Sequence, residues 1–80
     1  MKKVLVTGAG GGMGQAIMKK LTYEGYFVYA LDLRDFDAPE NAKKILCDLR
    51  DEASVNAAFE SVSAECDSLF AIIHTAGIYD

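Results

Sequence analysis

The sequence predicts an α/β protein built around a parallel sheet with helices on both faces. Two observations support this prediction. Short apolar, β-branched segments alternate with amphipathic helical segments along the 80-residue chain, an alternation typical of parallel sheets. A cluster of glycines directly follows the first apolar segment, where a strand has to turn sharply into a helix. With 51% hydrophobic residues, 25% charged residues and one proline, the composition is that of one globular domain.

The first part of the chain predicts a strand, a helix and a second strand. Residues 2–7 form a short β-branched and leucine run, typical of a buried strand. Apolar residues then recur at helical spacing from Gly12 to Glu24, and Gly25 stands where a left-handed residue commonly ends a helix. Aromatic and β-branched residues predict a second strand over 26–31, closing on Asp32.

The second part predicts two more strands and one helix. Residues 33–43 are polar, and we expect one helical turn there at most. A third strand is expected over 45–47, followed by a helix that Asp51 caps and that ends near Cys66. Residues 69–74 predict a fourth strand that is apolar on both faces. Right-handed crossovers then place the two helices on opposite faces and give the strand order 3-2-1-4.

The turn after the first strand predicts a phosphate site. Five of the seven glycines lie between positions 8 and 14, more than a flexible turn needs. Glycines let the backbone approach an anion closely, and the helix that follows offers free N–H groups and a positive dipole end. The chain contains no Gly-Lys-Ser/Thr sequence, and the G-x-G-x-x-G pattern counted from Gly8 fails at Met13.

The spacing of these residues resembles that of a known family. Thr7-Gly8-x-x-x-Gly12-x-Gly14 resembles the signature of the short-chain dehydrogenase/reductase family. The spacing Gly8-x-x-Gly11-x-x-Gly14 resembles that of its extended members. The resemblance covers the whole chain, which corresponds to the opening, truncated part of such an enzyme.

Further matches to the family follow in the same order. Asp32, at the end of the second strand, resembles the family's ribose-binding acid, and Asp48-Leu49 resembles its pair beside the adenine. Ala76-Gly77 resembles the close of its Asn-Asn-Ala-Gly motif. Two departures remain: a histidine and a threonine replace the two asparagines, and residues 33–43 are too few for the family's usual second helix.

The resemblance implies a Rossmann-like NAD(P)-binding domain over residues 1–80. Asp32 lies near the expected distance after the glycines, and its carboxylate repels a 2′-phosphate, which favours NAD over NADP. Arg34 complicates this choice, and we expect it to be solvated or stacked near the adenine. The residues expected to bind the cofactor are Gly8, Gly11, Gly12, Met13, Gly14, Asp32, Leu33, Asp48, Leu49, Ala76 and Gly77.

The chain offers no catalytic residue that we assign. The family's acid–base pattern is Tyr-x-x-x-Lys with a serine nearby, and no tyrosine here has a lysine four residues later. We expect His74, at the end of a buried strand, to be packed and hydrogen-bonded. The resemblance thus implies the NAD(H)-binding portion of an oxidoreductase acting on an alcohol or ketone, with no activity in this stretch alone. Two cysteines, widely spaced, suggest no metal site.

Two other classes of function remain open: a stand-alone dinucleotide-binding or sensing module, and an interaction protein that has lost the ligand. A net charge of −4 argues against nucleic acid. The first apolar run is too short for a signal or membrane segment, so a cytoplasmic location is expected. The apolar edge of strand 69–74 predicts either self-association or a missing C-terminal part that covers it.

Overall fold

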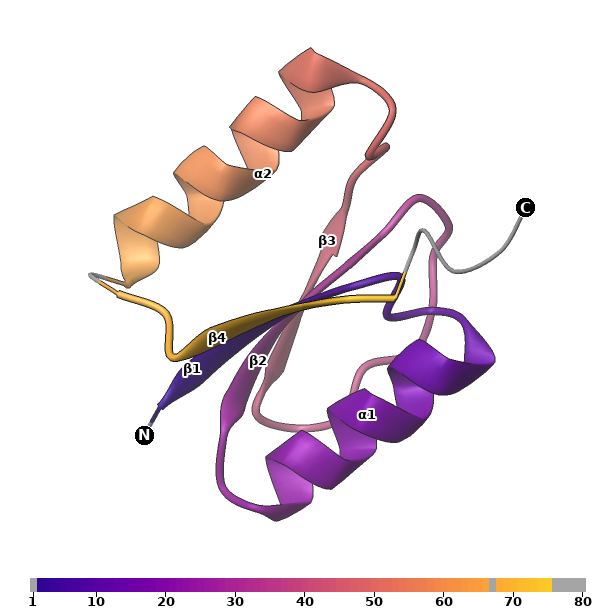
Figure 1. Ribbon diagram of the computed structural model, residues 1–80, viewed down its shortest axis with the longest axis vertical. Coiled ribbons are helices and arrows are strands. Elements are labelled where there is room, and N and C mark those ends of the chain that lie inside the picture. The colour runs from indigo at the N-terminus through magenta and orange to yellow at the C-terminus, as the bar shows by residue number, and fades with distance from the viewer. Residues whose placement is uncertain (1, 67, 76–80) are drawn as a thin grey trace.

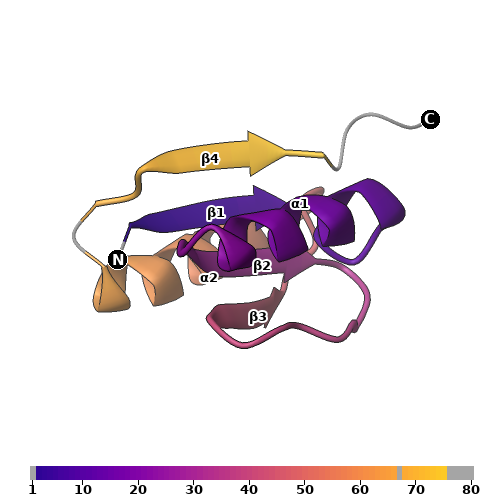
Figure 2. The ribbon, with the colours of Figure 1, turned by 90° about the horizontal axis from the view of Figure 1, so that it is seen from below.

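The computed structural model describes residues 2–66 and 68–75 and forms a four-stranded sheet between two helices (Figure 1). The elements in chain order are β1 (Lys3–Thr7), α1 (Gly12–Tyr23), β2 (Phe27–Asp32), β3 (Ala42–Leu46), α2 (Glu52–Glu65) and β4 (Ala71–His74). The strands pair in parallel in the order β3-β2-β1-β4 (Figure 2), which confirms the predicted fold class and strand order.

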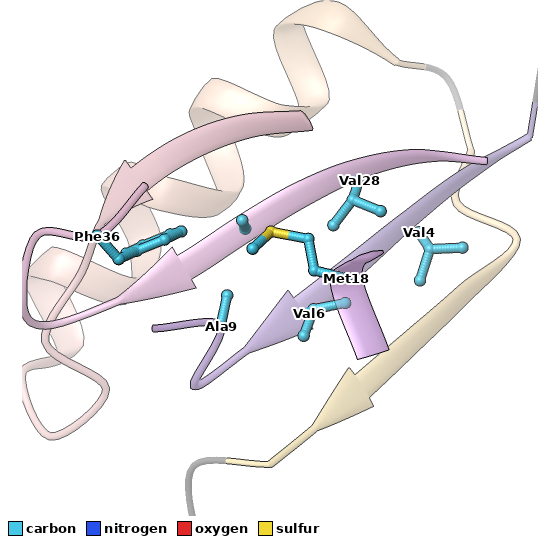
Figure 3. Close-up of a cluster of buried hydrophobic side chains, with 7 residues drawn as sticks. Val4, Val6, Ala9, Met18, Val28 and Phe36 are labelled. Atoms are coloured by element: carbon cyan, nitrogen blue, oxygen red, sulfur yellow. The ribbon is translucent and has the colours of Figure 1, made fainter. Parts of the chain in front are cut away.

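The two helices cover opposite faces of the sheet (Figure 1). Successive side chains of a strand point to opposite faces, so β1 and β2 each supply residues to two cores. The core under α1 contains Val4, Val6, Ala9, Met18, Val28, Ala30 and Phe36 (Figure 3). The core under α2 contains Leu5, Tyr29, Leu31, Cys47, Ala58 and Val62. Because both faces are buried, β1 and β2 are nearly continuous apolar runs.

The third and fourth strands differ from the predicted bounds. β3 starts at Ala42, three residues before the expected start, and pairs with β2 from Val28↔Ala42 to Asp32↔Leu46. The prediction missed this start because two lysines at a half-exposed sheet edge leave no apolar run. β4 begins at Ala71, two residues after the expected start, since its register with β1 begins at Val4↔Ala71.

The connections between elements follow the expected turn chemistry. Gly25 adopts a left-handed conformation with φ of 95° just after α1, as predicted. Residues 33–41 contain no helix, so even the single helical turn that was allowed there is missing. Within the part of the chain that the structure describes, no helix is both long and apolar enough to cross a membrane.

Candidate functional site

The turn between β1 and α1 is fastened to the strands on both sides. Gly8 has a left-handed φ of 69° and accepts a hydrogen bond from Gly11 N at 3.2 Å. Ala9 N donates to Leu31 O at 3.0 Å, which ties the turn to β2. On the other side, the buried Thr75 hydroxyl lies 3.2 Å from Gly8 O. The turn therefore lies at the carboxyl ends of β2, β1 and β4.

The amino end of α1 carries no charge of its own. Gly11 is its N-cap, no described side chain caps it, and its first turn contains no acidic residue. The first N–H groups of a helix have no acceptor within the helix, and the dipole makes this end positive. These groups are therefore available to an anion.

Two glycines of this turn serve different purposes. A Cβ on Gly14 would lie 2.0 Å from Gly8 O, so the fold itself requires a glycine there. A Cβ on Gly12 would have no described residue within 4 Å. The described fold therefore does not use the space beside Gly12. An anionic group approaching the helix fits this gap.

Asp32 faces the same turn from the end of β2. Its Oδ2 accepts a hydrogen bond from Gly10 N at 2.8 Å, and its Oδ1 accepts one from Arg34 N at 3.1 Å. A carboxylate has about four acceptor positions, so each oxygen retains capacity for another donor. The half-buried Asp32 carboxylate is thus held in one orientation beside the glycines and can still accept hydroxyl groups.

A cleft of about 270 Å³ joins the glycine turn to the ends of β2 and β3. It is lined by Gly8, Gly11, Asp32, Leu33, Arg34, Cys47, Asp48, Leu49 and Arg50. Most of the residues expected to bind the cofactor are therefore brought together. Gly12, Met13 and Gly14 continue from the cleft into α1. Ala76 and Gly77 lie outside the residues that the structure describes.

Asp48 and Arg50, which line the cleft, form an ion pair. Asp48 Oδ1 accepts hydrogen bonds from Arg50 N at 3.0 Å and from Arg50 Nε at 3.2 Å. The backbone bond first, and then the guanidinium, hold the pKa of Asp48 below its ordinary value. Asp48 N in turn donates a hydrogen bond to the Ser54 hydroxyl oxygen at 2.9 Å. Asp48 is therefore ionised and fixed at neutral pH.

Two residues of the cleft were missed. Cys47 and Arg50 line the cleft but were not expected there; their positions next to Asp48-Leu49 were the only available signal. Outside the cleft, His74 was expected to be packed and hydrogen-bonded. It shares a hydrogen bond with Thr7 between Nδ1 and Oγ1 at 3.1 Å, as expected, but it is exposed rather than packed, because β4 is an edge strand among the described strands.

A larger hollow of about 700 Å³ lies at the amino ends of β1 and β4, with Lys3, Glu65 and Phe70 on its walls. It contains none of the glycines and none of the predicted residues. We place the candidate site in the smaller cleft because the free helix end and the fixed carboxylate meet there.

Known proteins share this fold. The chain matches the model of the short chain dehydrogenase family over residues 2–80. It is 34% identical to 3-amino-tetrahydro-pyrrolizinone reductase from Xenorhabdus hominickii, over 96% of this chain and 29% of that protein.

Two solved structures extend the comparison. Ligand-free aldohexose dehydrogenase from Thermoplasma acidophilum superposes with a TM-score of 0.86 at 32% identity, covering 95% of this chain and 29% of that one. A uronate dehydrogenase from Agrobacterium tumefaciens, complexed with NAD, superposes with a TM-score of 0.72 at 36% identity, covering 99% of this chain and 28% of that one.

The chain spans only about 29% of the length of the reductase that it matches. Within that span, the family match extends over residues 2–80 and includes the glycine turn, Asp32 and the cleft between them. The chain belongs to the short chain dehydrogenase family.

Proposed function

We propose that this chain is the NAD(H)-binding portion of an oxidoreductase that acts on an alcohol or ketone. The observation that carries the proposal is the pairing of the uncapped amino end of α1, with its gap beside Gly12, and the Asp32 carboxylate in one cleft. These two features suit two parts of a dinucleotide. The helix end is suited to the pyrophosphate and the carboxylate to a ribose.

Several residues of the cleft have a task in this proposal. The first-turn N–H groups of α1 would bind the pyrophosphate oxygens. Asp32, already oriented by Gly10 and Arg34, would accept the two ribose hydroxyls. Leu33 and Leu49 present exposed apolar surface to the cleft, which suits the flat face of an adenine. Asp48-Leu49, Met13 and Ala76-Gly77 complete the proposed contacts.

Asp32 also supports a choice between the two cofactors. A 2′-phosphate would have to approach a carboxylate that backbone N–H groups hold in place, and like charges repel. Arg34, on the same wall of the cleft, helps to orient that carboxylate through its backbone N–H. We therefore propose NAD(H) as the preferred cofactor.

The bound nicotinamide would supply a hydride acceptor or donor. The similar proteins include a reductase and dehydrogenases of an aldohexose and a uronate, which favours interconversion of an alcohol and a carbonyl group. Within residues 1–80 no tyrosine is followed by a lysine four residues later. We therefore assign the proton transfer of this reaction to no residue of this stretch.

Calorimetric titration of the chain with NADH and with NADPH tests the proposal. We expect NADH to bind more tightly than NADPH. Equal affinities would contradict the preference for NAD(H), and no binding of either nucleotide would contradict the proposed function.

The free edge of β4 supports a further part of the proposal. Phe70 is 57% exposed and Ile72 is 47% exposed. Among the described strands, β4 pairs with β1 alone. An exposed apolar edge favours pairing, so we propose that a second copy or further chain covers it. Light scattering should show self-association of the 80-residue chain, and a monomer at high concentration would count against a second copy.

The cytoplasmic location stays a prediction, which cell fractionation would test.

A further inference from the structure

The loop between β2 and β3, residues 33–41, has a single buried anchor. Its other residues are exposed or half-exposed, whereas Phe36 is only 9% exposed. Its ring belongs to the core under α1, in the layer of Ala9 and Met18 (Figure 3). The loop's ion pair, between Asp35 and Lys44, is exposed, and exposed pairs contribute little to stability. Burial of Phe36 therefore supplies most of what holds this loop down.

Phe36 also lies against the glycine turn. A Cβ built on Gly10 would lie 3.3 Å from Phe36 Cβ and 2.9 Å from Asp32 Oδ2. The space beside Gly10 is thus bordered by both the aromatic residue and the carboxylate. Its N–H donates to that same Oδ2 at 2.8 Å, and its carbonyl accepts from Gln15 Nε2 at 3.0 Å. Asp32, Gly10 and Phe36 form one stack, which we call the loop stack.

The second oxygen of Asp32 depends on the loop as well. Arg34 N, two residues before Phe36, donates to Asp32 Oδ1 at 3.1 Å. If the loop lifts from the core, Arg34 N moves with it, and the packing of Phe36 beside Gly10 is lost. Both hydrogen bonds that orient the carboxylate would then weaken together.

We infer that Phe36 is a positioning residue that holds Asp32 in the orientation that selects NADH over NADPH. The inference rests on the proposed function for its ligand and on the loop stack for its geometry. Phe36 touches neither nucleotide in this proposal. It acts through Gly10 and the loop, by keeping the Asp32 carboxylate fixed.

The test compares Phe36→Ala and Phe36→Leu with the parent chain. For Phe36→Ala we expect the NADH dissociation constant to rise about tenfold, as for the loss of one charge-assisted hydrogen bond. The NADPH dissociation constant should change less. The ratio of the NADPH to the NADH dissociation constant therefore falls toward one. Phe36→Leu keeps an apolar anchor and should restore most of the ratio. Val62→Ala, in the core under α2, is the matched control and should lower the melting temperature without changing the ratio.

A ligand-free measurement separates this inference from the proposed function. Hydrogen exchange of the Gly10 and Arg34 amides should accelerate in Phe36→Ala but not in Val62→Ala. If the parent binds neither nucleotide while these amides respond as expected, the proposed function fails and the loop stack stands. Unchanged exchange at both amides in Phe36→Ala would overturn the inference.

Gly10→Ala keeps the inference testable if Phe36→Ala does not fold. Gly10 does not have a positive φ, so the backbone tolerates a side chain. The added methyl group enters the loop stack and must displace the carboxylate or the ring. We expect the same fall in the ratio of dissociation constants as in Phe36→Ala. A parent-like ratio in Gly10→Ala would overturn the inference.

Discussion

The two helices of this chain both begin at the carboxyl ends of the strands. Their first turns differ in which groups bind the free N–H groups. α2 is capped by Asp51, whose side chain accepts a hydrogen bond from Ala53 N at 3.2 Å, and Glu52 follows in its first turn. α1 begins at Gly11, where no described side chain caps it, and its first turn has no acid. One helix satisfies its positive end with its own carboxylates, whereas the other leaves that end free.

This difference indicates which of the two helix ends is available to a ligand. An N-terminal carboxylate stabilises a helix by binding its free N–H groups and complementing its dipole. The same carboxylate repels any other anion from that position. Asp48, near the start of α2, is paired with the Arg50 guanidinium and therefore adds little net charge there. An anion is attracted to the beginning of α1, whereas Asp51 and Glu52 repel it from the beginning of α2.

Filling the gap at the free end of α1 should have the largest effect. In Gly12→Val the side chain occupies the space proposed for the pyrophosphate, and we expect NADH affinity to fall by at least about a hundredfold. The fold should persist, because a Cβ there meets no described residue. Gly14→Ala is the contrasting variant, since its Cβ would lie 2.0 Å from Gly8 O and should lower the melting temperature. Titration and thermal unfolding of both variants check this, and parent-like NADH binding by Gly12→Val would contradict it.

Removing the acid that faces this helix should have the next largest effect. Asp32→Ala deletes two proposed charge-assisted hydrogen bonds to ribose, each worth roughly 1.5–3 kcal/mol, less what water restores. NADH should bind at least about tenfold more weakly. NADPH should lose less, or gain, because its 2′-phosphate no longer meets a carboxylate. Calorimetry with both nucleotides checks the prediction, and an unchanged ratio of affinities would show that Asp32 does not choose the cofactor.

The sequence predicted those parts of the fold that a local pattern encodes. β1 and β2 are buried on both faces and therefore appear as apolar runs, and the glycines mark a turn that only they can make. β3 was misplaced because Lys43 and Lys44 give an edge strand a polar appearance. The burial of Phe36 could not be predicted, since one aromatic residue in a polar segment has no periodicity.

For the candidate site, spacing predicted which residues gather but not how they are held. Asp32 was placed correctly beside the glycine turn, yet its bonds to Gly10 and Arg34 depend on the path of the loop. Likewise, the pairing of Arg50 with Asp48 follows from a turn that no pattern in the sequence marks.

Giving α1 the cap that α2 has should produce a smaller effect: the stability of the fold should rise and the affinity for NADH should fall. Gly11 has the extended conformation of an N-cap, with φ of −78° and ψ of 171°, which a non-glycine residue adopts without backbone strain. Gly11→Asp should raise the free energy of unfolding by about a few tenths of a kcal/mol and weaken NADH binding by charge repulsion. Gly11→Asn supplies a similar cap without charge and should weaken binding less. If both variants bind NADH equally, the charge is not what matters at this end of the helix.

Removing the cap of α2 should have the smallest effect on binding. Asp51→Ala leaves Ala53 N without its acceptor, and loss of such a cap costs about 1 kcal/mol of stability. NADH affinity should stay within about twofold of the parent, because the free end of α1 is untouched. Asp51→Asn retains the cap and should recover most of the stability. Urea unfolding with and without NADH measures both quantities on the same samples. A loss of NADH affinity in Asp51→Ala beyond that range would mean that the two helix ends are coupled, and the contrast between a satisfied end and a free one would then not explain where the cofactor binds.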